Sequence, residues 1–234
     1  MWNKLIRYKR KEIIIVEGKF ITIEGIDGCG KTSQIELLKK RFENADKKFW
    51  FTTEPTNGPI GKLIREDYLS GNIFLNDKIV LDSLFIADRL DHITSANGIK
   101  YHQADKDNVI CDRYIISGIS YMATNLMLKY KYNIDEAIGK AFGQNKTAAD
   151  LLMPDINFIL DLRPEDAAKR MERRNELEIY ENMDFQFKVY DAIHSTVNIM
   201  KCLYPKTKFI YIDANDSPEY INEKIWNHIY EIIN

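Results

Sequence analysis

The sequence predicts an α/β fold, with a five-stranded parallel sheet that carries helices on both faces. Five short β-rich segments are nearly continuously apolar, the pattern expected of strands that are buried on both faces. Segments with helical periodicity alternate with them, and this order favours right-handed crossover connections. The chain has 234 residues, 45% of them hydrophobic, so it can bury one substantial core.

The predicted strands and helices alternate along the chain. The strands are Lys19–Gly25, Lys48–Pro55, Asn108–Tyr114, Ile156–Leu162 and Lys208–Asn215. The helices are Thr32–Glu43, Asn76–Ile93, Ser117–Tyr130, Pro164–Glu178, Met183–Leu203 and Ser217–Ile233. Ligands of such folds bind beyond the carboxyl ends of the strands, so we expect the functional residues there.

Each predicted helix rests on its own local pattern. The first follows the first strand directly, and the second repeats apolar residues at helical spacing, at Leu81 and Leu84 among others. The third follows the third strand, and the fourth is rich in charged residues, above all arginine. The last two close the chain, and apolar residues such as Ile225 and Trp226 are expected to pack against the sheet.

The chain is predicted to form one domain over residues 19–234, preceded by an N-terminal extension of residues 1–18. The formal net charge of −2 gives no general basic field for nucleic acid, and no apolar run is long enough for a membrane segment. The cysteines Cys29, Cys111 and Cys202 have no C-x-x-C spacing. This spacing suggests neither a zinc site nor a disulfide framework, and it favours a reduced, cytoplasmic compartment.

A phosphate-binding loop is predicted where the first strand ends, in EGIDGCGKT. The segment matches the pattern G-x-x-x-x-G-K-[ST] between a strand and a helix, as that pattern requires. Lys31 would reach the β- and γ-phosphates of a nucleotide, and Thr32 would bind Mg²⁺. The expected nucleotide-binding residues are Gly25, Gly28, Cys29, Gly30, Lys31, Thr32 and Ser33. The alternative is a plain glycine-rich turn.

The third predicted strand ends in Asp112 and Arg113. An aspartate at the end of an apolar strand is typical of a Mg²⁺ ligand in phosphate-loop proteins, in part through water. Arg113, beside the loop, would bind a second phosphate group. An ion pair of Arg113 with Asp112 or Glu54 is the alternative.

A pocket for a second substrate is expected on the helix Asn76–Ile93. Phe85 and Arg89 are four residues apart and therefore share a helix face. A ring and a guanidinium on one face would stack on a base and bind its monophosphate. The alternatives are core packing for Phe85 and an ion pair of Arg89 with Asp88 or Asp91.

Six motifs in order make the chain resemble the thymidylate kinase family. They are GIDGCGKTSQ, TTEPTNGPIGKLIRE, LFIADRLDH, DRYIISGISY, PDINFILDLRPEDAAKR and RNELEIYE, and the resemblance runs from Phe20 to Ile233. It implies the fold class of the P-loop NTPases and an enzyme that transfers the γ-phosphoryl group of ATP, with Mg²⁺, to thymidine monophosphate (dTMP). It also implies a role in dTTP synthesis and a homodimer.

The resemblance also implies roles for single residues. Phe85 would stack on thymine, and Arg89 and Arg113 would hold the acceptor phosphate. Tyr121 would lie against the deoxyribose, and Asp27 would face the acceptor's sugar. The remaining residues that it places around the acceptor are Glu54, Pro55, Arg65 and Ser117, and Glu181 would lie near the acceptor's sugar or the metal.

The chain departs from the family pattern at three positions. Many members have an arginine at the position of Thr53, and some have one at the position of Gly28. At Gly118, where a side chain often hydrogen-bonds the base, the chain has none. Base recognition must then come from the backbone, from water or from another residue.

A lid is predicted at about residues 163–182, beginning with the helix Pro164–Glu178. Arg170, Arg173 and Arg174 share one helical face and would supply the cation that Gly28 cannot. With Lys31 and Arg113, they are the expected catalytic residues. The alternative is a solvated helix with ion pairs along its surface.

Three competing functions remain open at this point. The chain could phosphorylate another nucleoside or deoxynucleoside monophosphate, or a deoxynucleoside, or it could bind nucleotides without turnover. A deoxynucleoside kinase needs a carboxylate base, whereas a phosphate acceptor is already anionic.

Overall fold

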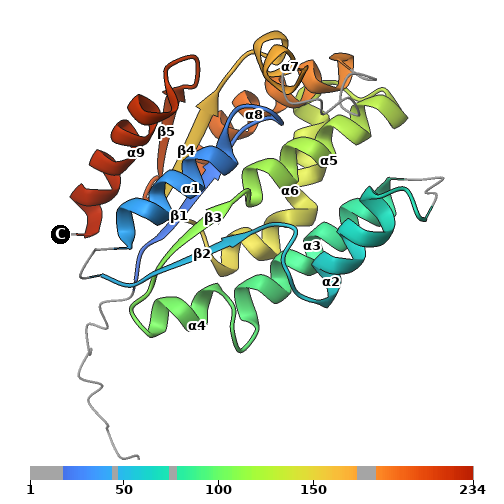
Figure 1. Cartoon of the computed structure of the whole chain (residues 1–234). Coiled ribbons are helices and arrows are strands. Elements are labelled where there is room, and N and C mark those ends of the chain that lie inside the picture. Colours follow the sequence, from blue (N-terminus) through green and yellow to red (C-terminus); the bar gives the residue numbers. More distant parts are fainter. Residues whose placement is uncertain (1–17, 44–46, 74–77, 173–182, 234) are drawn as a thin grey trace, which may run out of the picture.

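The computed structural model describes residues 18–43, 47–73, 78–172 and 183–233. Five parallel strands form one sheet in the order β2-β3-β1-β4-β5 (Figure 1). Their bounds are Phe20–Glu24 (β1), Phe49–Thr53 (β2), Asn108–Asp112 (β3), Ile156–Asp161 (β4) and Lys208–Asp213 (β5). The predicted α/β class, with five parallel strands, is confirmed.

Helices cover both faces of the sheet, with α1 and α9 on one side and α5, α6 and α8 on the other (Figure 1). The helices are α1 (Lys31–Phe42), α2 (Pro59–Leu63), the π-helix η1 (Ile64–Leu69), α3 (Ile79–Thr94), α4 (Ile99–Ala104), α5 (Ile115–Tyr130), α6 (Ile134–Leu151), α7 (Pro164–Glu172), α8 (Met183–Leu203) and α9 (Pro218–Ile233). None of these described helices has both the length and the hydropathy needed to span a bilayer.

Four of these elements were not predicted from the sequence: α2, η1, α4 and α6. The longest of these, α6, contains Gly139 and Gly143 and many polar residues, which weaken the periodic signal. A start signal was nevertheless present, because the side chain of Asn133 accepts a hydrogen bond from the backbone N–H of Glu136 at 2.9 Å. This is the usual role of an asparagine at a helix N-cap.

Two of the strands are less buried than predicted. All five residues of β2 are only partly buried, and β5 exposes both of its end residues. Both strands lie at the edges of the sheet, where one side has no neighbouring strand. The prediction of burial on both faces holds for β1, with all five residues buried, and nearly so for β3 and β4.

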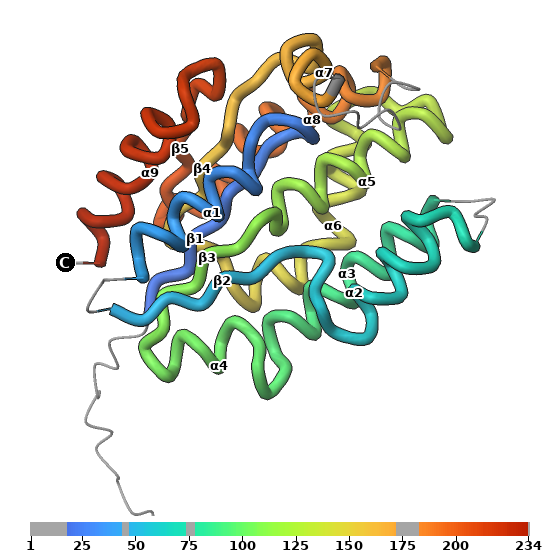
Figure 2. The backbone as a smooth tube through the Cα atoms, viewed as in Figure 1, coloured from blue at the N-terminus to red at the C-terminus, as the bar shows by residue number. Residues whose placement is uncertain are grey.

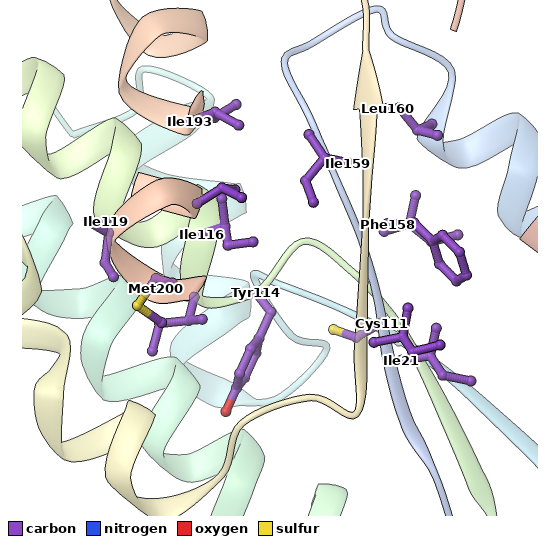
Figure 3. Packing of buried hydrophobic residues seen from close by; sticks show 14 of the residues in the cluster. Ile21, Cys111, Tyr114, Ile116, Ile119, Phe158, Ile159, Leu160, Ile193 and Met200 are labelled. Atoms are coloured by element: carbon purple, nitrogen blue, oxygen red, sulfur yellow. The ribbon is translucent and has the colours of Figure 1, made fainter. Parts of the chain in front are cut away.

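The hydrophobic core fills the space on both faces of the central strands. In β4, Ile159 points toward Ile116 of α5 and Ile193 of α8, whereas its neighbours Phe158 and Leu160 point to the opposite side (Figure 3). This alternation follows from the two-residue period of a strand. Phe158, Ile159 and Leu160 are each at most 2% exposed, so β4 is fixed from both sides.

The direction of the crossovers reverses at β1. The chain leaves β1 toward β2 and β3 on one side, and later crosses to β4 and β5 on the other. Figure 2 shows the chain turning from β1 into α1 at the end of the sheet where β3 also leads into α5. Ligands of open α/β sheets bind at such a reversal point. The segments after β1 and β3 therefore form the centre of the site.

Candidate active site

The loop between β1 and α1 has the backbone of a phosphate-binding loop. Gly25, Gly28 and Gly30 all have positive φ angles, of 145°, 76° and 104°. Gly30 is the N-cap of α1, and a Cβ atom added there would meet no atom within 4 Å. The loop therefore leaves an open space at a helix N-terminus, and the first turn of α1 has no acidic residue. Both features suit an anion.

Lys31 begins α1 and is folded back over this loop. Its ammonium group donates hydrogen bonds to the carbonyl oxygens of Ile26 at 2.7 Å and Gly25 at 3.2 Å, and it lies 3.7 Å from Sγ of Cys29. Lys31 is only 6% exposed. Its charge is therefore concentrated at the loop, where phosphate oxygens would accept the same N–H groups.

Two side chains beside the loop fit a Mg²⁺ ion. Oδ1 of Asp112, at the end of β3, is buried and has no hydrogen-bond partner among the described residues. Thr32, the second residue of α1, has an exposed side chain. Mg²⁺ is usually held by one or two protein oxygens together with phosphates and water. An unpartnered carboxylate oxygen and a hydroxyl group meet that requirement.

A cavity of about 560 Å³ lies next to the phosphate-binding loop. Ligand sites in proteins span a range of about 300–1,000 Å³. Among its lining residues are eight of the ten predicted acceptor-site residues: Asp27, Glu54, Pro55, Phe85, Arg89, Arg113, Ser117 and Tyr121. They come from four separate segments of the chain. The fold therefore brings together side chains that the motifs alone could only order along the sequence.

Asp27 joins the loop to this cavity. One carboxylate oxygen forms an ion pair with Arg113, and the other accepts a hydrogen bond from the hydroxyl of Tyr121 at 2.9 Å. Burial by itself would raise the pKa of Asp27, but the charges of Arg113 and Lys31 outweigh it and leave the pKa below its ordinary value. Asp27 is thus held as a carboxylate. The predicted alternative pairs of Arg113, with Asp112 or Glu54, are not formed.

Arg113 is fixed by the backbone as well. It has a φ angle of 64°, and its Nη1 donates to the carbonyl oxygen of Gly25 at 2.9 Å and to Oγ of Ser117 at 3.3 Å. Burial opposes the charge of Arg113, but nearby Tyr121 and Asp27 raise its pKa above the ordinary value. The guanidinium is therefore a permanent cation between the loop and the cavity.

Glu24 is a buried residue of this site that the motifs did not reveal. It is fully buried at the end of β1, and its carboxylate accepts hydrogen bonds from the backbone N–H groups of Tyr114 at 2.9 Å, Ser117 at 3.2 Å and Ile116 at 3.3 Å. No side chain of its own segment caps α5. Glu24 therefore caps this helix from the neighbouring strand. Burial raises the pKa of Glu24 above its ordinary value.

Arg89 lies at the wall of the cavity with its guanidinium held on several sides. Its Nε donates to Oε2 of Glu54 at 2.8 Å, its Nη1 to Oδ1 of Asn145 at 2.7 Å, and its Nη2 to the carbonyl oxygen of Tyr114 at 3.1 Å. Glu54, which also contacts His92 at 3.1 Å, is the ionic partner of Arg89. The predicted alternatives, Asp88 and Asp91, are not. Burial would lower the pKa of Arg89, but Glu54 raises it above the ordinary value.

Phe85 and Arg65 differ in their relation to the cavity. Phe85 lines it, one helical turn before Arg89 on α3. Arg65 does not line it. Its guanidinium bonds instead to the carbonyl oxygen of Pro55 and, at 2.9 Å, to Oδ1 of Asn57. Arg65 therefore braces the turn after β2, while Tyr68 and Leu69 of the same π-helix line the cavity.

The predicted lid lies partly outside the described residues. Helix α7 is described only to Glu172, so Arg173, Arg174 and Glu181 fall outside. Arg170 is described, and its Nη2 donates to the carbonyl oxygen of Ala214 at 2.6 Å. This contact ties α7 to the turn after β5.

Sequence reasoning also missed Asn145, which lines the cavity from α6. No motif marks it, because α6 itself was not predicted. Glu24 did stand directly before Gly25, and a charged residue ending an otherwise apolar strand was the only available signal.

Comparisons with known proteins show the family of the chain. The family model described as Thymidylate kinase matches residues 23–225. The "Probable thymidylate kinase" of Methanocaldococcus jannaschii is 38% identical over 219 residues, covering 93% of this chain and 99% of that protein. The "Thymidylate kinase" of an Exiguobacterium species is 30% identical over 216 residues, covering 92% and 96%. The chain therefore belongs to the thymidylate kinase family, the family that its six motifs had indicated.

Proposed function

We propose that the protein transfers the γ-phosphoryl group of ATP to dTMP, giving thymidine diphosphate for dTTP synthesis. The observation that carries this proposal is the ion pair of Asp27 with Arg113, which sets a cation of the acceptor cavity directly against the phosphate-binding loop. Phosphoryl transfer between two nucleotides needs positive charge where their phosphates meet. Membership of the thymidylate kinase family supports dTMP as the acceptor.

In this proposal the donor phosphates are bound by the loop and by Lys31. The backbone N–H groups of Gly28 to Thr32 and the N-terminus of α1 contact the phosphate oxygens, and Lys31 exchanges its carbonyl partners for them. Asp112 and Thr32 hold Mg²⁺, in part through water. The ion, when bound, neutralises the charge that develops on the phosphate oxygens.

The acceptor occupies the cavity of about 560 Å³. Phe85 stacks on the base, Tyr121 lies against the sugar, and Arg113 binds the phosphate whose oxygen attacks. That oxygen is already anionic, so the reaction needs no general base. Glu54 is the carboxylate that follows β2. Its Oε2 contacts the guanidinium of Arg89 and its Oε1 contacts Nδ1 of His92. Because both oxygens are engaged, Glu54 is poorly placed to act as a base on a sugar hydroxyl, and the site suits a phosphate acceptor better.

Other expectations from the sequence belong to the same proposal. Residues 19–234 act as one domain, with a lid at about 163–182 in which Arg170, Arg173 or Arg174 approaches the transferred group. Two copies form a homodimer, and the enzyme is cytoplasmic.

A panel of acceptors at fixed ATP·Mg²⁺ tests the proposal. We expect dTMP to be phosphorylated with a higher kcat/KM than the monophosphates of deoxyuridine, uridine and deoxycytidine. Thymidine itself should not be a substrate. Turnover of thymidine but not of dTMP would replace the proposal by a deoxynucleoside kinase. Binding of ATP and dTMP without any diphosphate product would replace it by a nucleotide-binding protein.

A further inference from the structure

The turn after β2 is held from α3 at two neighbouring positions. Asp88 and Arg89 are adjacent in α3, and they bond to the residues on either side of Pro55. Arg89 pairs with Glu54, which precedes Pro55, and Asp88 accepts hydrogen bonds from Thr56, which follows it. The function proposed above assigns no role to Asp88 or Thr56. Both are therefore candidates for positioning the part of the cavity wall that this turn forms.

Asp88 binds Thr56 through both of its carboxylate oxygens. Oδ2 accepts the backbone N–H of Thr56 at 2.8 Å, and Oδ1 accepts its hydroxyl group at 2.6 Å. Asp88 is 1% exposed and Thr56 is 8% exposed, so water competes little for these hydrogen bonds. Loss of the carboxylate would take away the acceptor of a buried N–H group, which is costly. The Asp88–Thr56 contact therefore fixes the backbone of the turn as well as a side chain.

The effect of this contact extends from Thr56 into the next two helices. The hydroxyl oxygen of Thr56 accepts the N–H of Gly58, the N-cap of α2, at 3.1 Å. A Cβ atom at Gly61 would lie 2.0 Å from the carbonyl oxygen of Thr56, so the first turn of α2 lies directly against this residue. Helix α2 continues into η1, and both contact α3 (Figure 1). The position of Thr56 therefore determines where η1 lies.

These segments form one wall of the acceptor cavity. Pro55 of the turn lines the cavity, as do Tyr68 and Leu69 of η1, and Phe85 lines it from α3. Arg65 of η1 donates to the carbonyl oxygen of Pro55, which joins the turn to η1 a second time. The distance between this wall and Phe85 sets the space into which a base stacked on the Phe85 ring must fit.

We infer that Asp88 is a positioning residue for acceptor binding, and this inference rests on the function proposed above. Asp88 does not itself line the cavity. By binding Thr56, it holds the turn after β2, and with it η1, at a fixed distance from Phe85. The cavity is then already formed when the acceptor binds, which lowers the cost of binding. The phosphate-binding loop belongs to other segments, so the effect is specific to the acceptor.

The test compares Asp88→Ala with Asp88→Asn. The first removes both hydrogen bonds, whereas an asparagine amide can keep both, because its oxygen accepts the N–H of Thr56 and its NH₂ group donates to the hydroxyl oxygen. We expect KM and the calorimetric Kd for dTMP to rise about tenfold in Asp88→Ala and to stay near the wild-type values in Asp88→Asn. In both variants, kcat at saturating dTMP and KM for ATP should not change. General destabilisation would produce neither this separation nor the rescue.

Thr56→Val and Thr56→Ser repeat the test from the other side of the contact. A valine side chain keeps the shape of threonine without its hydroxyl, so Thr56→Val should raise Kd for dTMP and Thr56→Ser should not. Combined with Asp88→Ala, Thr56→Val should raise Kd no further, because both remove one contact. If circular dichroism shows that Asp88→Ala does not fold, Thr56→Val against Thr56→Ser decides. Asp91→Ala is the matched control, since Asp91 is an exposed acid of the same helix outside the cavity lining, and it should keep the wild-type values.

An unchanged Kd for dTMP in folded Asp88→Ala would overturn the inference, and so would an equal loss of affinity for dTMP and ATP. It would also be overturned if Asp88→Asn bound dTMP as weakly as Asp88→Ala, because the charge and not the hydrogen bonds would then be responsible. If the wild type binds dTMP with the expected dependence on Asp88 but forms no product, only the proposed kinase activity fails. A wild type that does not bind dTMP would overturn both.

Discussion

Asp27 of the phosphate-binding loop and Arg113 of the turn after β3 form an ion pair, although 86 residues separate them in the sequence. Gly25 strengthens the connection, because its carbonyl oxygen accepts a second hydrogen bond from Arg113 at 2.9 Å. The donor loop and the cation of the acceptor cavity are thus joined through side chain and backbone. An acid inside a phosphate-binding loop is stable here because Arg113 and Lys31 compensate its charge.

Asp27→Asn should weaken acceptor binding and change stability in acid. We expect a rise in KM for dTMP with little change in KM for ATP, because the amide cannot form the ion pair with Arg113. The carboxyl pKa lies below its ordinary value of 3.8 in the folded protein. Its contribution to stability is therefore complete above that value and is lost as pH falls through the lower, folded-state pKa. Urea unfolding between neutral pH and pH 3 measures it. A stability difference between variant and wild type that grows toward acid would contradict this sign.

Lys31→Ala should lower kcat by about 10²–10³-fold, the cost of removing one charge-stabilising donor from a transition state. The fold should remain, because Lys31 bonds only to the loop and does not pack in the core. Circular dichroism and the melting temperature check the fold. Lys39→Ala, on the exposed side of the same helix, is the control and should keep full activity. Near-normal turnover by Lys31→Ala would refute the role of the loop.

Glu24→Gln should remove the part of the pH dependence of the free energy of unfolding that comes from the Glu24 carboxyl group. Burial raises the pKa of Glu24 above its ordinary value of 4.5, so the folded protein holds this proton more tightly than the unfolded chain. The contribution of Glu24 to the free energy of unfolding therefore falls as pH rises from 4.5 through the folded-state pKa. Denaturant unfolding across this range should show a shallower decline in Glu24→Gln than in the wild type. Parallel curves for the two proteins would rule out this account.

Arg170→Ala tests whether Arg170 holds α7 in place for ATP binding or stabilises the transition state. The contact of Arg170 with the carbonyl oxygen of Ala214 connects α7 to the turn after β5. We expect its loss to raise KM for ATP more than it lowers kcat. Lys169→Ala removes the neighbouring, exposed charge, which pairs with Asp166, and serves as the control. A large fall in kcat with KM unchanged would instead support Arg170 as the transition-state cation, a role for which the sequence offered Arg170, Arg173 and Arg174.

The sequence predicted the elements that carry strong local signals. All five strands were found because their apolar runs are bounded by turns, and the loop after β1 because its glycines and Lys31 have fixed spacing. Helix α6 was missed since its glycines and polar residues hide its periodicity. That omission also hid Asn145, which lines the cavity and accepts a hydrogen bond from Arg89, 56 residues away. Partners of this kind depend on how helices pack, which no local pattern encodes.

Other parts of the site needed the same tertiary information. The sequence placed Arg89 and Phe85 on one helix face, yet offered Asp88 and Asp91 as ionic partners where the fold supplies Glu54. Local charges were the only candidates visible along the chain. Glu54 reaches Arg89 only because β2 ends beside α3.

The capping of α5 by Glu24 has a consequence for hydrogen exchange. The amides of Tyr114, Ile116 and Ser117 stand at a helix N-terminus, where backbone N–H groups have no partner within the helix and usually exchange fast. Here a fully buried carboxylate from the next strand accepts all three. They should exchange as slowly as the centre of the sheet and open only together with β1. The end of β1 and the start of α5, which lie between the proposed donor and acceptor sites, would then move as a single rigid unit. Any closure over the substrates must therefore come from other segments around the site.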